Sequence, residues 1–318
     1  MVWFYVVLFL VCCAAFYFVG ELVVDSLMKI ATFLGWKEFV VAFIVIAFAS
    51  SLPNLFVGLS AALHGIPQLS FGDVAGNNLV ALTIGVAFAA FFAKGGIPAN
   101  SRVIQSTAIF TIISAVLPLI LVLDSELSRG DGLVLIGLFI FYIIWLFSKK
   151  ERFSKIYDGR RVNRLKHFGK FVGDLVKVAL GVLVLIIASQ GIVKSAQMFA
   201  SGLNISLVLI GVLITGASST LPEIYFAVKS AKEGETWLIL GDLMGAVIIP
   251  SSLVLGLVAL ISPIKIADFS PFAIARIFLV LASIFFFFFV RSDRHITKKE
   301  AFLLLVIYLL FLYFEIFF

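Results

Sequence analysis

Long, uninterrupted runs of apolar residues dominate the chain. A transmembrane helix needs about 20 predominantly apolar residues. The apolar positions do not alternate with polar ones as barrel strands would, and only helices and closed barrels satisfy the backbone inside lipid. The pattern therefore predicts an all-α, polytopic membrane protein with ten transmembrane helices, at residues 2–24, 38–63, 67–93, 103–123, 131–148, 171–196, 204–230, 236–261, 270–290 and 300–317.

Composition supports the same class. Of the 318 residues, 62% are hydrophobic and only 13% are charged, which is too little charge for a soluble domain of this size. The N-terminus has no Lys or Arg before its apolar run, unlike a secretory signal peptide. We therefore expect residues 1–20 to be retained as the first span. Cys12 and Cys13 are adjacent and cannot form an ordinary disulfide, and we assign them no role.

One connection differs from the others in length and charge. Residues 149–170 carry nine Lys or Arg against two acidic residues. They divide the chain into a first repeat of five expected spans, residues 1–148, and a second repeat of five, residues 171–318. Such a loop usually marks the cytoplasmic side of a membrane. It also has the charge to bind anionic lipid or a regulator, whereas the formal net charge of +6 does not lead us to infer nucleic-acid binding.

The basic residues also predict an orientation. If the loop 149–170 is cytoplasmic, 19 of the 24 Lys and Arg fall on that side and three on the other, as the positive-inside rule requires. Both termini then lie outside, and the odd number of spans in each half inverts the second half relative to the first. The small size favours a prokaryotic plasma membrane. Membrane lipid is an expected partner, and the sequence indicates no oligomeric state.

The two halves share sequence at an offset of 169 residues. The motif Gly-Asp-x-x-Gly occurs at 72–76 and again at 241–245, and Ser-Ser-Leu-Pro-Asn at 50–54 corresponds to Ser-Thr-Leu-Pro-Glu at 219–223. Nine of the 30 positions from 49 to 78 are identical to their mates without a gap. Matched Pro, Gly and Asp positions are not expected from apolar composition alone, so the sequence indicates an internal repeat.

The matched prolines predict two broken helices. Pro53 and Pro222 lie well inside their expected spans, where proline removes a backbone hydrogen bond and clashes with the preceding turn. The hydroxyl residues before each proline can satisfy freed backbone groups, or freed carbonyls can face an ion. A lone proline would indicate only a packing kink. Two in register, in inverted halves, are typical of a transporter's midplane binding site.

Three acidic residues lie deep in the expected spans: Asp73, Glu223 and Asp242. No Lys or Arg lies at a comparable depth, and intramembrane carboxylates are costly and usually functional. They therefore require a cation or a proton, and oxygen ligands suit Ca²⁺, Mg²⁺ or Na⁺. The three histidines fall in connections or at span ends, so no zinc-type site is expected: His64, His167 and His295.

These motifs resemble the two α-repeats of the cation/calcium antiporter superfamily, which includes the sodium/calcium exchangers. That family typically reads Gly-Thr-Ser-Leu-Pro-Glu in each half, and the matching residues here are 49–54 and 218–223. Its second motif, Gly-Asn-x-x-Gly-Ser-Asn, is similar to residues 72–78 and 241–247. The resemblance extends to the ten spans in two sets of five and to the hydrophilic central loop, and the chain is identified as a divergent member.

The resemblance implies antiport of Ca²⁺ against Na⁺ or H⁺ by alternating access, with the transported cations as ligands and no cofactor. It implies an acidic ligand at Glu223, hydroxyl ligands at Ser51 and Thr220, and backbone carbonyl ligands at the two serines that precede them. Asn77 matches a polar position of the second motif. With the deep acids, the expected cation site comprises Ser50, Ser51, Asn54, Asp73, Asn77, Ser219, Thr220, Glu223 and Asp242.

The sequence departs from the family pattern at several of these positions. Asn54 stands where the first acidic ligand is expected, whereas Asp73 and Asp242 replace the first Asn of each second motif. Each aspartate lies four residues, about one helical turn, before Asn77 or Ala246. The number of carboxylates is therefore kept or raised, and their distribution is shifted. Three expected polar positions are apolar: Ala81, Ala246 and Pro250. The ions or their ratio are accordingly expected to differ from those of an ordinary sodium/calcium exchanger.

The leading hypothesis is a secondary active cation antiporter. An alternative is an intramembrane aspartyl hydrolase using Asp73 and Asp242, since two aspartates can share a proton and activate water. Against it, such enzymes carry Gly-x-Gly-Asp, and residue 70 here is Ser. Another alternative is a non-transporting homologue with a structural or regulatory role, because polar positions of the motifs are lost. We therefore predict a transporter and not an enzyme.

Overall fold

The computed structural model describes residues 2–34, 45–148, 164–266 and 272–317, and these are almost entirely helical. Eight helices in this part of the chain are long and apolar enough to cross a membrane. This confirms the all-α, polytopic fold. The eight are Trp3–Leu34, Pro67–Phe92, Arg102–Asp124, Arg129–Ser148, Gly169–Leu203, Leu207–Glu233, Leu238–Ile261 and Ala273–Arg291.

Two of the ten expected spans are not among these eight. The expected span 38–63 falls partly outside the described residues, and its described part includes α4 (Leu52–Leu63), a shorter apolar helix. The expected span 300–317 corresponds to α16 (Lys298–Phe317), whose 20 residues include a charged first turn. The count of ten therefore stays a prediction.

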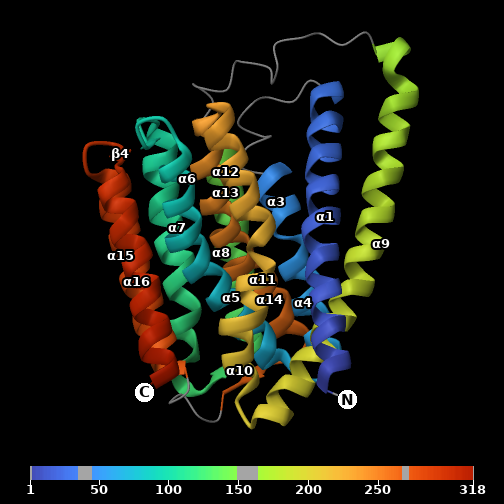
Figure 1. Cartoon of the computed structure of the whole chain (residues 1–318), viewed down its shortest axis with the longest axis vertical. Coiled ribbons are helices and arrows are strands. Elements are labelled where there is room, and N and C mark those ends of the chain that lie inside the picture. Colours follow the sequence, from blue (N-terminus) through green and yellow to red (C-terminus); the bar gives the residue numbers. More distant parts are fainter. Residues whose placement is uncertain (1, 35–44, 149–163, 267–271, 318) are drawn as a thin grey trace.

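The first and sixth expected spans are longer in the structure than the sequence pattern suggested. They are α1 (Val2–Leu34) and α9 (Arg164–Leu203), which pack side by side along most of their length (Figure 1). Helix α9 thus begins inside the segment 149–170 that was expected to be a loop. Cys12 and Cys13 are free thiols buried on the inner side of α1, where Cys12 faces α9.

The two halves contain the same elements in the same order. The first half has α3 (Ala47–Ser50), α4, α5 (Pro67–Val80), the π-helix η2 (Ala81–Gly85) and α6 (Val86–Phe92). The second has α11 (Gly216–Ser219), α12 (Leu221–Glu233), α13 (Thr236–Ile249), the π-helix η6 (Pro250–Val254) and α14 (Leu255–Ile261). Each element begins 169 residues after its mate, so the repeat in the sequence is also a repeat in the backbone.

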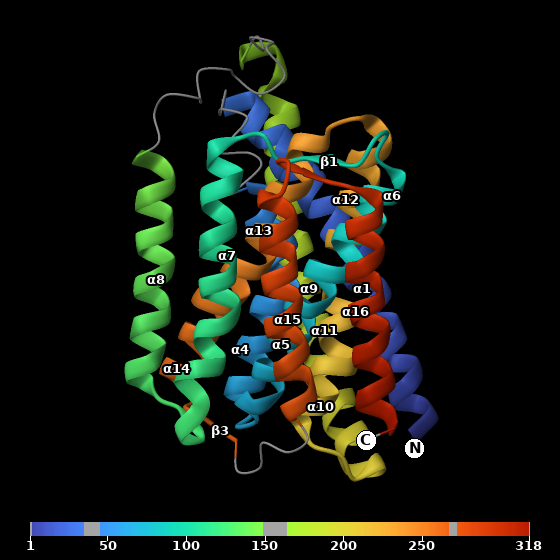
Figure 2. The same ribbon diagram turned by 90° about the vertical axis from the view of Figure 1, so that its left-hand side faces the viewer.

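Short strand pairs at opposite ends of the molecule show that the halves are inverted. Strand β1 (Ile97–Pro98) pairs with β4 (His295–Ile296), and β2 (Glu126–Leu127) pairs with β3 (Ile264–Lys265), both antiparallel. Figure 2 shows β1 at the upper end and β3 at the lower end. Each pair joins one half to the other, and both chain termini lie at the same end (Figure 1).

The last helix of each half packs on the opposite half. Helix α8 (Arg129–Ser148) contacts α14, and α16 contacts α6. Helices α7 (Arg102–Leu121) and α15 (Ala273–Arg291) contact each other between them. The two halves therefore exchange their terminal helices.

Helices α5 and α13 form the centre of the molecule and are the most buried long helices. Glycines let α5 approach the segment that includes η5 (Gly211–Thr215): a Cβ at Gly72 or Gly76 would collide with the backbone of Val208 or Val212. Small residues allow such close backbone contact between helices in membranes. The polar residues of both motifs are held in this tightly packed core.

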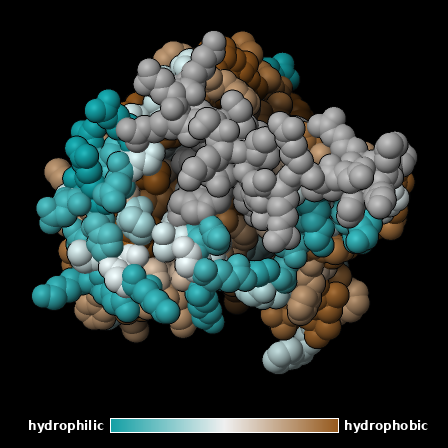
Figure 3. Space-filling view, turned by 90° about the horizontal axis from the view of Figure 1, so that it is seen from above, coloured by the Kyte–Doolittle hydropathy of each residue, from teal (hydrophilic) through white to brown (hydrophobic). Residues whose placement is uncertain are grey.

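The surface agrees with a membrane setting. Large apolar side chains are exposed along α1, α8 and α9, including Trp3, Phe141 and Ile187. In the end view of Figure 3, hydrophilic side chains gather over the end of the molecule and hydrophobic ones appear at its rim. A wide exposed apolar belt of this kind indicates a surface that lipid covers.

Candidate cation site

Both helices break at the predicted prolines. Helix α3 ends at Ser50 and α4 begins at Leu52, with Pro53 in its first turn; α11 and α12 are divided in the same way by Thr220. This confirms the expectation from the sequence. The break occurs because proline cannot donate to the preceding turn and clashes with it.

Hydroxyl groups cap the turn before each break. Ser51 Oγ donates to the carbonyl of Ala47 at 2.7 Å, and Thr220 Oγ1 donates to the carbonyl of Gly216 at 2.5 Å. These residues are one repeat apart and make the same bond. These two carbonyls also accept from the backbone N–H groups of Ser51 and Thr220, so they are not the groups that the prolines free. Both roles that the sequence left open therefore stay predictions.

All nine residues expected in the site are buried, with at most 1% of each exposed. The bonds between the halves follow the internal symmetry. Ser50 Oγ donates to Asp242 Oδ1 at 3.1 Å, and Ser219 Oγ donates to Asp73 Oδ1 at 3.3 Å. Each first-motif serine therefore holds the second-motif aspartate of the other half.

The second oxygen of Asp73 accepts a hydrogen bond from the side-chain amide of Asn54. Asn54 Nδ2 donates to Asp73 Oδ2 at 3.1 Å and to Ser219 Oγ at 2.9 Å. The Thr215 side chain lies beside the same carboxylate and adds a further hydrogen-bonding group. Both oxygens of Asp73 therefore have a donor.

Glu223 has the opposite environment. Among the described residues, neither of its carboxylate oxygens has a hydrogen-bond partner, and Asp242 Oδ2 and Asn54 Oδ1 are also buried without one. Glu223 interacts electrostatically with both aspartates, and its interaction with Asp242 is the stronger of the two. The ion pairs found among the described residues include none of these acids. Burying ionised, unpaired carboxylates costs about several kcal/mol, so the arrangement requires a cation or a proton.

The other expected site residues are satisfied within the protein. Thr220 Oγ1 lies 2.9 Å from Asn77 Oδ1 as well as 2.5 Å from the carbonyl of Gly216, so its single hydrogen serves one of these acceptors at a time. Asn77 Nδ2 donates to the carbonyl of Ala246 at 2.9 Å. Asn77 and Ala246 are mates in the repeat, so the halves meet at this contact. Ser51 bonds only within its own turn. Hydrogen bonds therefore join Ser50 to Asp242, and Asn54 to Asp73 and Ser219. Glu223 interacts electrostatically with both aspartates.

In the part of the chain that is described, no group of three or more His, Cys, Asp or Glu side chains is arranged to hold a metal ion alone. A cation here would need amide and hydroxyl oxygens together with the carboxylates. That donor set is all oxygen, which fits hard cations such as Ca²⁺ and Na⁺. The residues present therefore fit a hard cation better than a transition metal.

Two acidic residues of α1 were not among the predicted deep acids, because Glu21 falls near the end of the expected span 2–24 and Asp25 just beyond it. Glu21 and Asp25 lie within α1, one turn apart and partly buried. Glu21 Oε1 lies 3.9 Å from Lys229 Nζ on α12, and Tyr225 hydrogen-bonds to Glu21. Two acids four residues apart in an otherwise apolar run were the available signal.

A buried polar centre between two inverted, broken-helix repeats defines the class of secondary transporters. The family model described as sodium/calcium exchanger protein matches residues 4–148 and 174–317, and the chain belongs to that family.

Its relatives include the sodium/calcium exchanger MaX1 of Methanosarcina acetivorans, 25% identical over 91% of this chain and 92% of the relative. The inner membrane protein YrbG of Escherichia coli is 24% identical over 79% and 78%. Among solved structures, the sodium-calcium exchanger NCX_Mj has the same fold, with a TM-score of 0.69, 22% identity and 98% coverage of both chains.

Family membership decides between two of the earlier hypotheses. The family is that of the sodium/calcium exchangers, which are transporters, and the relative MaX1 is a sodium/calcium exchanger. The intramembrane aspartyl hydrolase is therefore excluded, and the chain is an integral membrane protein of a cation-antiporter family.

Proposed function

We propose that the chain is a secondary active antiporter that exchanges Ca²⁺ or a related cation for Na⁺ or H⁺ by alternating access. The observation that carries this proposal is Glu223, which is fully buried and has no partner on either oxygen. The sodium/calcium exchangers MaX1 and NCX_Mj, with which the chain shares family or fold, support the choice of ions.

In this proposal, competing cations use the same oxygens. Glu223 and Asp242 attract a cation, Ser50 supplies a hydroxyl oxygen beside Asp242, and Asn54 contributes its buried amide oxygen. Ca²⁺ and Na⁺ cannot both occupy these groups, and a proton on a carboxylate removes its charge. Competition for one set of ligands therefore couples the two fluxes.

The moving part in this proposal is the pair α1 and α9. The two helices pack mainly against each other and reach the broken helices through α4 and α12. Sliding or rocking of this pair against the core would open the site to one side at a time, as expected for inverted-repeat transporters. For orientation, we propose a prokaryotic plasma membrane with both termini outside and the basic segment 149–170 cytoplasmic.

Flux measurements in proteoliposomes test this function. Gradients of Ca²⁺, Na⁺, K⁺ and H⁺ are imposed one at a time on the wild-type chain and on Glu223→Gln. Glu233→Gln is the matched control, since Glu233 is exposed at the end of the same helix.

We expect Ca²⁺ flux driven by Na⁺ or H⁺ in the wild type and the control, and none in Glu223→Gln. Absence of flux in the wild type under every gradient would instead support the non-transporting alternative, which the losses at Asn54, Ala246 and Pro250 favour.

A further inference from the structure

The two aspartates of the site are mates in the repeat but have different surroundings. Asp73 has Asn54 and Ser219 as donors, with Thr215 beside it. Asp242 has a single donor, Ser50, and its second oxygen is unpartnered.

Two sequence differences produce this inequality. The mate of Asn54 is Glu223, an acceptor in its charged form, and the mate of Thr215 is Ile46, which has no polar group. Both differences supply hydrogen-bonding groups to Asp73 and remove them from Asp242. Two independent positions therefore both give Asp73 more hydrogen-bonding groups than Asp242, and we treat the inequality as a property of the site.

The orientation of the Asn54 side-chain amide is determined by the neighbouring carboxylate of Asp73. A carboxylate only accepts hydrogen bonds, so the NH₂ group must face Asp73 Oδ2. The carbonyl oxygen then points away from Asp73, and it is buried with no partner. The amide thus presents a donor to one half and a free oxygen to the remainder of the site.

We propose, on the basis of the antiporter function above, that the Asn54 amide replaces a cation at Asp73. The transported cation is then bound in the second half, by Glu223 and Asp242 with Asn54 Oδ1 as a neutral ligand. These three side chains carry four buried oxygens for which no hydrogen-bond partner is found among the described residues: both of Glu223, Oδ2 of Asp242 and Oδ1 of Asn54. Its two carboxylates match the charge of one divalent cation. Asn54 is the specificity-determining residue because it decides which aspartate takes part.

Equilibrium binding of radioactive Ca²⁺ to the purified full chain tests the proposal. Asp73→Asn and Asp242→Asn are the same substitution at mated, fully buried positions. We expect Asp242→Asn to weaken binding at least about hundredfold, since a charge next to the cation is lost. Asp73→Asn should weaken it by less than about tenfold, because its carboxylate is held by Asn54.

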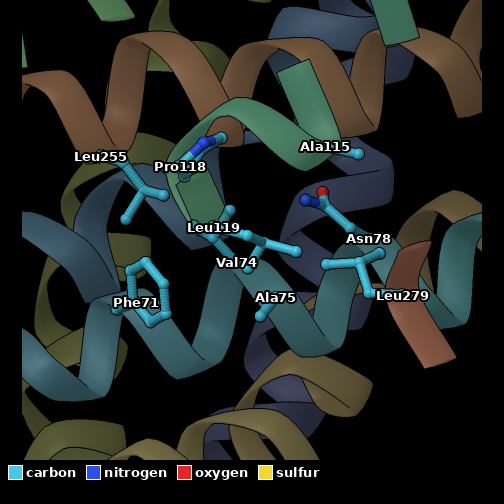
Figure 4. A pocket seen from close by; sticks show the side chains of 9 residues that line it. All are labelled: Phe71, Val74, Ala75, Asn78, Ala115, Pro118, Leu119, Leu255 and Leu279. Atoms are coloured by element: carbon cyan, nitrogen blue, oxygen red, sulfur yellow. The ribbon is translucent and has the colours of Figure 1, made fainter. Parts of the chain in front are cut away.

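A second variant tests the role of the amide directly. Asn54→Asp removes the donor at Asp73, so that Asp73→Asn in this background should cost as much as Asp242→Asn does in the wild type. The control for an added buried carboxylate is Asn78→Asp. Asn78 is also buried on α5, but its amide donates to Ser251 at 2.7 Å. It borders a small apolar cavity of about 10 Å³, lined also by Phe71, Val74 and Leu119 (Figure 4), and we expect its Ca²⁺ affinity to change less than about threefold.

The outcomes separate the two proposals. No Ca²⁺ binding and no flux in the wild type would overturn the antiporter function itself. Wild-type binding with equal losses in Asp73→Asn and Asp242→Asn would leave that function standing and overturn the role of Asn54. If Asn54→Asp does not fold, the comparison of the two aspartates still decides the matter.

Discussion

The first and second halves of the molecule are alike in their scaffold and unlike in their chemistry. Their broken helices, π-helices and central helices coincide at an offset of 169 residues, and their serines make mirrored bonds to the opposite aspartates. Yet an amide occupies the position in one half where the other has a carboxylate, Asn54 against Glu223.

This difference shows which part of a repeat is constrained by the backbone. Pro53 and Pro222 occur at the break in each half, and Gly72 and Gly76 allow the close approach of α5 to the segment 208–212. The side chains that face the cation are under no such geometric requirement. These side chains can therefore differ between the halves. In our proposal the second half supplies the charged cation ligands and the first half supplies a neutral one.

The largest effect on Ca²⁺ affinity should come from making the halves alike at the position of Asn54 and Glu223. Glu223→Asn gives the second half the residue of the first, and the new amide can donate to Asp242. We expect Ca²⁺ binding to fall about a thousandfold or more, since a charge pair at about 4 Å contributes roughly 4 kcal/mol at an effective dielectric of about 20. Equilibrium binding of radioactive Ca²⁺ measures it, and Glu223→Asp, which keeps the charge, should retain affinity within about tenfold. Retained affinity in Glu223→Asn would remove Glu223 from the site.

Alanine variants of the two mated serines should differ in how far Ca²⁺ restores their thermal stability. Ser50→Ala removes the one described donor to Asp242, and Ser219→Ala removes one of several groups around Asp73. Each should reduce stability by about 1.5–3 kcal/mol, as for hydrogen bonds to charged groups. Thermal unfolding in detergent, with and without Ca²⁺, should show that Ca²⁺ restores Ser50→Ala and not Ser219→Ala. Equal restoration would mean that both aspartates bind the cation.

Two turn glycines should respond equally, because they belong to the common scaffold. Gly65 and Gly234 are mates, with φ of +71° and +82° and open space around each Cβ position. Alanine at either should cost about 1 kcal/mol, from backbone conformation alone. Unfolding and Ca²⁺ binding should be measured together, and a change in affinity at only one of the two would show that the asymmetry extends beyond the site.

The smallest effect should come from the contact between α1 and α12. Glu21→Gln removes a partly exposed ion pair with Lys229 at 3.9 Å, and such pairs contribute about 0–1 kcal/mol. Lys229 has no charged mate, since the corresponding residue is Ser60. We expect unchanged Ca²⁺ affinity and a small change in exchange rate in proteoliposomes. Loss of binding would place Glu21 in the site.

Much of this arrangement was accessible from the sequence. The prolines predicted both breaks, and Asp73, Glu223 and Asp242 stood out as deep acids without basic partners. All three are fully buried, and Glu223 is within electrostatic reach of both aspartates. These predictions depend on strong local rules, namely that proline interrupts a helix and that lipid does not tolerate isolated charge.

The missing part depends on contacts between the halves. An amide can donate or accept, so the role of Asn54 was decided only by Asp73 Oδ2 beside it. The sequence did not predict Thr215 as a site residue, since a single hydroxyl in an apolar run has no distinctive pattern. Asn77 was expected to be a ligand, yet its amide is bonded on both sides by Thr220 and Ala246. Its ligand role stays a prediction.

The exchanged terminal helices bear on how such a chain can be divided. Because α8 covers α14 and α16 covers α6, either half synthesised alone would leave an apolar groove where its neighbour's last helix belongs. A half-length polypeptide would then associate with a second copy to fill that groove. Two half-length chains produced together should find each other, whereas each produced separately should aggregate or pair with itself.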